Sequence, residues 1–257
     1  MRTALRAEWT KLRTSPGTIW LLLAAVALTV GVSAAAAATI PCHAVGCTGD
    51  PAKISLTGVQ LGQAVVTILA VLVVSGEYGT GMIRVSLTAV PRRITLLAAK
   101  AVLVTGVIAV TGAVAIGASV LAGRLLLPGG GFTTAHGFTA LSLADGPVAR
   151  AAAGSVLYLS LVALLALGIA TVVRDTAAAI GVVLALFYLA PIITQAVSDP
   201  AWKRHLQQFA PTAGLAIQAT RDLAGLPISP WKGLAVLAAW AAGALVAGGL
   251  LLRLRDA

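Results

Sequence analysis

Long apolar stretches, interrupted at regular intervals by single charged residues, are the main pattern in this chain. Stretches of 23 uncharged residues occupy positions 54–76, 101–123, 151–173 and 176–198, 20 more occupy 233–252, and another apolar stretch runs from about 17 to 40. A helix needs about 20 such residues to cross a bilayer, where it satisfies its own backbone hydrogen bonds. The pattern therefore predicts an all-α membrane protein with six spans, at about 17–40, 54–76, 98–124, 150–173, 176–198 and 232–253.

Residues 1–15, ahead of the first span, predict an amphipathic helix. Leu5, Trp9 and Leu12 follow one another at helical spacing, and basic residues lie beside them. We expect this helix to lie in the headgroup plane. Its membrane-interface residues would be Arg2, Arg6, Trp9, Lys11 and Arg13. An ordinary basic flank is an alternative, and so is a cleaved signal peptide over residues 1–40, although Glu8 fits its basic region poorly.

Composition and charge support a membrane protein. The chain is 59% hydrophobic and only 10% charged, whereas soluble domains carry about 25% charged residues. The net charge of +10 is explained better by basic cytoplasmic loops than by nucleic-acid binding, because aromatic residues make up only 5% of the chain. Eleven Lys and Arg residues lie on the side of the termini and seven on the other. Both termini are therefore expected in the cytoplasm, and nucleic acid is not an expected partner.

The spans lack the chemistry of ion-coupled transport and of catalysis. No Asp, Glu, Lys, Arg or His lies in the central windows of the spans, which argues against a proton-driven transporter and an intramembrane protease. The motifs HExxH, GxxxxGK[ST] and GxGxxG are absent. We therefore expect this chain to be no enzyme and to hold neither a metal nor a cofactor of its own.

Two cysteines lie in the first predicted outside loop. An oxidising exterior permits a disulfide between Cys42 and Cys47. Free thiols remain an alternative, as does a metal site that includes His43. The other two histidines, His136 and His205, are expected to be solvated loop residues.

The connection between the second and third spans gathers an unusual amount of charge. Residues 75–93 read SGEYGTGMIRVSLTAVPRR and hold one of the two glutamates of the chain together with three arginines. Gly79 and Gly81 can end the second span, Thr80 can cap a short helix over about 81–89, and Pro91 suits the first turn of the next helix. A solvated basic loop is the alternative.

This connection resembles that of type-2 ABC exporter permeases. The residues that carry the resemblance are Glu77-Tyr78-Gly79-Thr80, then Pro91-Arg92-Arg93, and Lys100. The N-terminal Glu8-Trp9-Thr10-Lys11-Leu12-Arg13 is also similar to bacterial members, especially those of high-GC Gram-positive genomes. The resemblance implies that a short coupling helix within 77–93 docks on a separate ATPase. The implied coupling residues are Glu77, Tyr78, Gly79, Thr80, Gly81, Arg84, Arg92 and Arg93.

The resemblance also implies an architecture and a function. Residues 1–257 would form one permease domain in the bacterial cell membrane, with short re-entrant helices in the outside segment 199–231. Two permeases would assemble with two ATPase subunits, which bind ATP and Mg, and membrane lipids would surround them. The expected activity is export by alternating access. A path lined by Ala, Val, Leu, Gly and Thr favours a small amphipathic or lipid-like substrate over a sugar polymer.

Two other functions stay open on the sequence. The chain could be a membrane anchor or sensor subunit that assembles with a partner but transports nothing. It could also be a membrane-embedded enzyme acting on lipids, which needs clustered polar residues near one interface. Segment 75–93 is the one candidate for such a cluster, and its single carboxylate argues against this activity.

Overall fold

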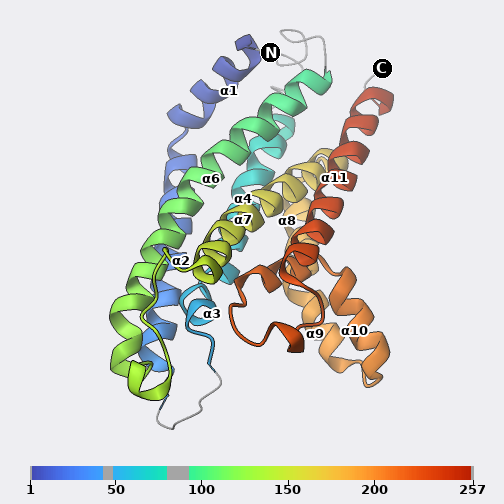
Figure 1. Ribbon diagram of the computed structural model, residues 1–257. Coiled ribbons are helices and arrows are strands. Elements are labelled where there is room, and N and C mark those ends of the chain that lie inside the picture. Colours follow the sequence, from blue (N-terminus) through green and yellow to red (C-terminus); the bar gives the residue numbers. More distant parts are fainter. Residues whose placement is uncertain (1, 43–48, 80–92, 256–257) are drawn as a thin grey trace.

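The computed structural model describes residues 2–42, 49–79 and 93–255, and within these ranges the chain forms helices and turns but no strand. Six helical segments of the described chain are long and apolar enough to cross a membrane. They are α2 (Pro16–Thr39), α4 (Val59–Gly79), α6 (Arg93–Leu126), α7 (Gly146–Val173), the succession α8 (Thr176–Leu184), η3 (Ala185–Leu189) and α9 (Ala190–Ala196), and α11 (Pro230–Arg255) (Figure 1). The prediction of an all-α membrane protein with six spans is confirmed to this extent.

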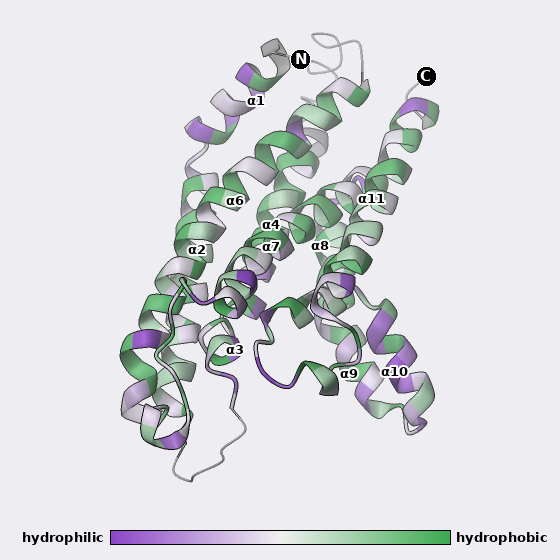
Figure 2. Ribbon diagram, in the orientation of Figure 1, coloured by the Kyte–Doolittle hydropathy of each residue, from purple (hydrophilic) through white to green (hydrophobic). Residues whose placement is uncertain are grey.

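The remaining elements lie at the two ends of the bundle (Figure 1). The short N-terminal helix α1 (Arg2–Thr14) lies at the same end as the last turns of α4 and α11 and the first turns of α6, which we call the terminal side. The opposite end, the loop side, carries α3 (Pro51–Ser55), η1 (Leu127–Gly130), η2 (Thr134–His136), α10 (Pro200–Phe209), η4 (Pro211–Gln218) and η5 (Leu223–Gly225). Hydrophilic residues concentrate on α1, on α10 and in the connections, whereas the spans are mostly hydrophobic (Figure 2).

The core of the bundle is built around α7 and α4. Each buries 61% of its apolar window inside the structure, whereas α2 and the span α8–α9 each bury 17%. Tyr158, Leu165 and Leu167 on α7 are fully buried, because α7 packs against α4, α6, α8 and α11. The second and fourth spans therefore form the interior, and the first and fifth present most of their apolar surface outward.

The second span is shorter than the sequence indicated. The uncharged window begins at residue 54, but α3 ends at Ser55 and α4 begins only at Val59. Asp50 caps α3 by accepting hydrogen bonds from the backbone N–H groups of Ala52 and Lys53. Gly58 lies in the break, and a Cβ atom there would stand 1.9 Å from the carbonyl oxygen of Thr29 on α2. The missing side chain lets the two helices approach closely, as small residues do between membrane helices.

The fifth span is interrupted by a π-helical turn over Ala185–Leu189. Pro191 follows this turn and has no backbone N–H, so a regular α-helical bond to the carbonyl of Phe187 cannot form. A local π turn is a common way to absorb such a defect. On this turn, the hydroxyl of Tyr188 donates to the backbone carbonyl of Gln60 on α4, which ties the fifth span to the second.

The connection before the last span is largely helical. It contains α10, followed by the 3-10 helices η4 and η5, where the sequence predicted short re-entrant helices in 199–231. In η4, Ala213, Gly214 and Ile217 are buried against the bundle, whereas no residue of α10 is buried. Re-entry of these helices into a membrane stays a prediction.

Candidate functional site

A buried ion pair joins three helices on the terminal side. Glu8 of α1 is only 4% exposed, and so is Lys100 of α6. The Nζ of Lys100 lies 2.7 Å from Oε2 of Glu8 and donates a second hydrogen bond of 3.1 Å to the carbonyl oxygen of Val73 on α4. Lys11, one turn after Glu8, lies 3.1 Å from the other carboxylate oxygen. We call Glu8, Lys11, Lys100 and the Val73 carbonyl the terminal junction.

The position of α1 explains the burial of these charges. The helix runs alongside the terminal-side part of α6 (Figure 1) and packs against it. Glu8 lies on the packed face, and Arg6, Trp9 and Arg13 are exposed on the other faces of the helix. Burying an ion is costly unless it is paired and hydrogen-bonded. Both ions meet that condition here, because Glu8 accepts from two lysines and Lys100 donates to two oxygens.

The terminal junction lies next to both ends of the connection 77–93. The carbonyl of Val73 belongs to α4 two turns before its last residue, Gly79, and Lys100 lies two turns after the first residue of α6, Arg93. A force applied to the connection would therefore reach α1, α4 and α6 together. The junction brings together two ammonium groups, one carboxylate and one backbone carbonyl oxygen.

The predicted coupling residues themselves are described only in part. Glu77, Tyr78 and Gly79 form the end of α4, and Arg93 begins α6, but nothing is described of their side chains. The other four, Thr80, Gly81, Arg84 and Arg92, lie outside the described residues, as does the predicted short helix over 81–89. Their roles therefore stay predictions.

The predicted interface residues all belong to α1. Arg6 and Arg13 are exposed, Trp9 is 49% exposed, and Lys11 is half-buried beside Glu8. Arg2 is the first residue of the helix, and its side chain is not described. The structure thus shows the helix that the amphipathic pattern indicated, and contact of its exposed face with lipid headgroups stays a prediction.

The pairing of Glu8 with Lys100 was missed by sequence reasoning. Both residues were noted separately, but 92 positions separate them, and a single sequence carries no signal for such a contact. One indication was available. Glu8 is one of two glutamates in a strongly apolar chain, and an isolated acidic residue near a span implies a buried basic partner.

On the loop side, Cys42 is buried and disulfide-bonded. Its expected partner Cys47 and the neighbouring His43 lie outside the described residues. The Nδ1 of His136 lies 2.7 Å from the carbonyl oxygen of Gly131, so this ring is held by its own loop. Over the described ranges, no three His, Cys, Asp or Glu residues come together to hold a metal ion.

A second polar cluster holds the loop side together. The carboxylate of Asp50 accepts hydrogen bonds from the backbone N–H and the hydroxyl of Thr220, both at 2.6 Å, and from the N–H of Arg221 at 3.0 Å. The guanidinium of Arg221 donates to the carbonyl of Gly137 and lies 4.3 Å from the ring centroid of Phe138. These contacts connect three loops and fix the segment before the last span.

Comparison with known proteins adds no assignment, since no protein-family model matches the chain and no curated protein matches it. Two features of the molecule itself bear on its function. One is the buried terminal junction around Glu8 and Lys100. The other is the absence of charge from the central windows of the spans.

Proposed function

We propose that this chain is the membrane subunit of an ATP-driven exporter of the bacterial cell membrane. It would move a small amphipathic or lipid-like substrate by alternating access while a separate ATPase subunit binds and hydrolyses ATP with Mg. The observation that carries the proposal is the buried pair of Glu8 and Lys100, which fastens α1, α4 and α6 together beside the connection that the ATPase would grip.

The mechanism depends on the contacts that hold α1, α4 and α6 together at this end of the bundle. Movement of the ATPase would displace 77–93, and the terminal junction would pass the displacement to α4 and, through core contacts, to α7. Because energy arrives through domain movement, the substrate path needs no titratable group in the membrane. This agrees with spans that lack charge in their central windows.

The assembly would contain two permeases and two ATPases. In support, α2 and the span α8–α9 leave most of their apolar surface outside the protomer core, where a second copy or membrane lipids can cover it. Both termini would lie in the cytoplasm. The terminal junction and the connection 77–93 would then face the compartment that contains ATP.

Capture of the full-length chain from its own bacterial membrane tests the proposal. We expect an ATPase subunit to be captured in about equal amount, and the complex to hydrolyse ATP in a Mg-dependent manner. Glu77→Arg and Arg84→Glu should each lower ATPase capture without changing the thermal unfolding of the permease. The control is Arg204→Glu, an exposed substitution on α10 of the loop side, which should leave capture unchanged.

Three results of this experiment would contradict the proposal. Equal ATPase capture by the parent and by both connection variants would remove the coupling role of 77–93. If no nucleotide hydrolase is captured at all, the proposed exporter function is contradicted. Stable capture of a partner that hydrolyses no ATP would favour the anchor or sensor function instead.

A further inference from the structure

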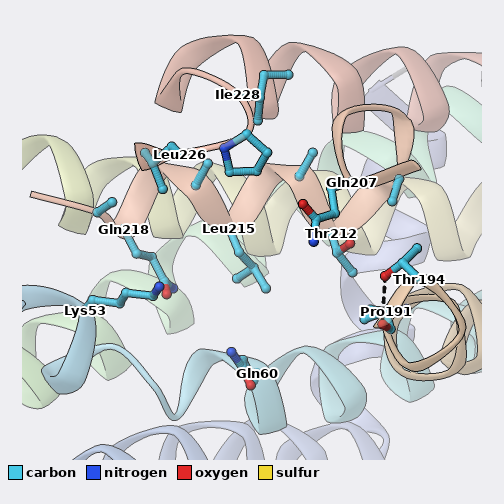
Figure 3. Close-up of a pocket in the computed structure, with 15 residues that line it drawn as sticks. Lys53, Gln60, Pro191, Thr194, Gln207, Thr212, Leu215, Gln218, Leu226 and Ile228 are labelled. Atoms are coloured by element: carbon cyan, nitrogen blue, oxygen red, sulfur yellow. Dashed lines mark hydrogen bonds between the residues drawn. The ribbon is translucent and has the colours of Figure 1, made fainter. Parts of the chain in front are cut away.

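A cavity of about 250 Å³ lies on the loop side, remote from the terminal junction. It is bounded by α3, by the first turn of α4, by α9 and by α10, η4 and the turn that precedes α11 (Figure 3). At about 30 Å³ for each water molecule, this volume holds roughly eight waters. The space is therefore sufficient for a small polar head with a short alkyl chain.

The wall of the cavity divides into a polar part and an apolar part. Lys53, Gln60 and Gln218 line the polar part, and Leu215, Leu226 and Ile228 line the apolar part. Thr194, Gln207 and Thr212 add uncharged polar groups on the side of α9 and α10. In Figure 3, Lys53 approaches Gln218 from one side, and Gln60 lies across the hollow from Leu215. Pockets of this kind, mostly apolar with a few placed polar groups, are typical ligand sites.

The charge of the cavity wall favours a negatively charged ligand. Lys53 is the one charged residue of the lining, which contains no carboxylate. The ammonium group of Lys53 has no ion-pair partner among the described residues. Gln218, which is buried, donates to Oγ of Ser155 at 3.3 Å, and the backbone carbonyl of Gln60 already accepts from Tyr188. The ammonium of Lys53 is thus the one charged group of the lining left for a ligand. The side-chain amides of Gln60 and Gln207 and the hydroxyl of Thr212 are the uncharged polar groups of the lining that no other described contact engages.

We infer that this cavity binds a small anionic amphiphile. Its acid group pairs with Lys53 and accepts a hydrogen bond from the side-chain amide of Gln60, and its alkyl chain packs against Leu215, Leu226 and Ile228. As a substrate site this assignment rests on the proposed export function, but binding itself needs no ATPase. The two proposals can therefore fail separately.

The test uses full-length protein in lipid nanodiscs without any ATPase. Leu215→Cys places a thiol on the cavity wall, and its modification rate by the small uncharged reagent methyl methanethiosulfonate is measured. Three probes of equal chain length compete with the reagent: octanoate, octanamide and octylammonium. Leu223→Cys is the control thiol, because Leu223 is an exposed loop-side residue that does not line the cavity.

We expect octanoate to protect Cys at position 215 at a concentration about fivefold lower than octanamide, in line with one solvent-exposed charge pair. Octylammonium should not protect, and no probe should protect position 223. When Lys53→Gln is combined with Leu215→Cys, octanoate should protect the thiol only at the concentration that octanamide requires. Adding Lys232→Gln, at an exposed lysine outside the cavity, should change nothing.

Each remaining outcome overturns the inference. A thiol at position 215 that the reagent does not modify means that the cavity is closed to ligands. Equal protection by the three probes, or equal protection at positions 215 and 223, means that the amphiphiles merely partition into the bilayer. Unchanged protection by octanoate in the Lys53→Gln variant means that Lys53 does not hold the acid group.

Discussion

Glu8→Gln should loosen the terminal side of the bundle, because it removes the carboxylate on which the terminal junction depends. The side chain keeps its size and its burial, so packing is nearly unchanged. Lys100 then retains the carbonyl of Val73 as an acceptor but loses the charged oxygen at 2.7 Å. Its ammonium group is left buried beside a neutral amide.

The magnitude follows from the geometry. For charges 2.7 Å apart, Coulomb's law gives about 6 kcal/mol of attraction at an effective dielectric constant of about 20. Desolvation of both ions offsets much of this attraction when the native pair forms. A variant that keeps one buried ion still incurs the desolvation cost of that ion but no longer gains the attraction. Such losses amount to about 3–5 kcal/mol. In a domain of this size they lower Tm by roughly 6–20 °C.

The assay is thermal unfolding of purified protein in detergent, followed by intrinsic tryptophan fluorescence, with Trp9 reporting on α1 itself. A double-mutant cycle isolates the pair. Glu8→Gln and Lys100→Met should each lower Tm, and the double variant should lose less than the sum, because the contact between Glu8 and Lys100 is already lost in each single variant. Arg13→Gln is the matched control, since Arg13 is exposed on the same helix.

Two results would refute this reasoning. If Glu8→Gln unfolds at the same temperature as Arg13→Gln, the buried pair contributes nothing measurable to the bundle. If the losses of the two single variants simply add in the double variant, Glu8 and Lys100 do not interact. Either result would also weaken the view that α1, α4 and α6 move as one unit.

Two further predictions concern helix packing and the loop side. Gly58→Ala should lower the free energy of unfolding by about 1–3 kcal/mol, because the added Cβ would overpack against the carbonyl of Thr29. Gly106→Ala, where nothing lies within 4 Å, should be neutral or stabilising, and equal effects at the two positions would contradict the close approach. Asp50→Asn should speed hydrogen exchange of the Thr220 amide by about tenfold, because a hydrogen bond to a charged group is lost; unchanged exchange would show that this contact does not hold the loop.

The six spans were predictable because the bilayer constrains the sequence so strongly. An unpaired charge in the hydrocarbon core is costly, so the uncharged windows mark the spans almost directly. The break after Ser55 and the π turn before Pro191 were not predicted as such. A charge-free window does not show where a helix is interrupted. The first interruption depends on how Gly58 packs on α2. The second accompanies Pro191, but the sequence did not show that a π turn would form there and bring Tyr188 to Gln60.

The candidate site was predictable only in its parts. The sequence pointed to Glu77 and to the basic residues that follow, and it singled out Glu8 and Lys100 without connecting them. Their contact depends on the rotation of α1 and on its placement against α6, which are set by packing between helices. The cavity near Lys53 escaped notice for the same reason, because its wall comes from segments spread between residues 53 and 228.

The proposed coupling requires the terminal side to face the cytosol, where an ATPase can reach the connection 77–93. Labelling of a Tyr78→Cys variant in intact cells with a membrane-impermeant maleimide tests this directly, with lysed cells as the reference. We expect the thiol to react only after lysis. Full labelling of intact cells would place the connection outside the cell and would contradict the proposed coupling to an ATPase.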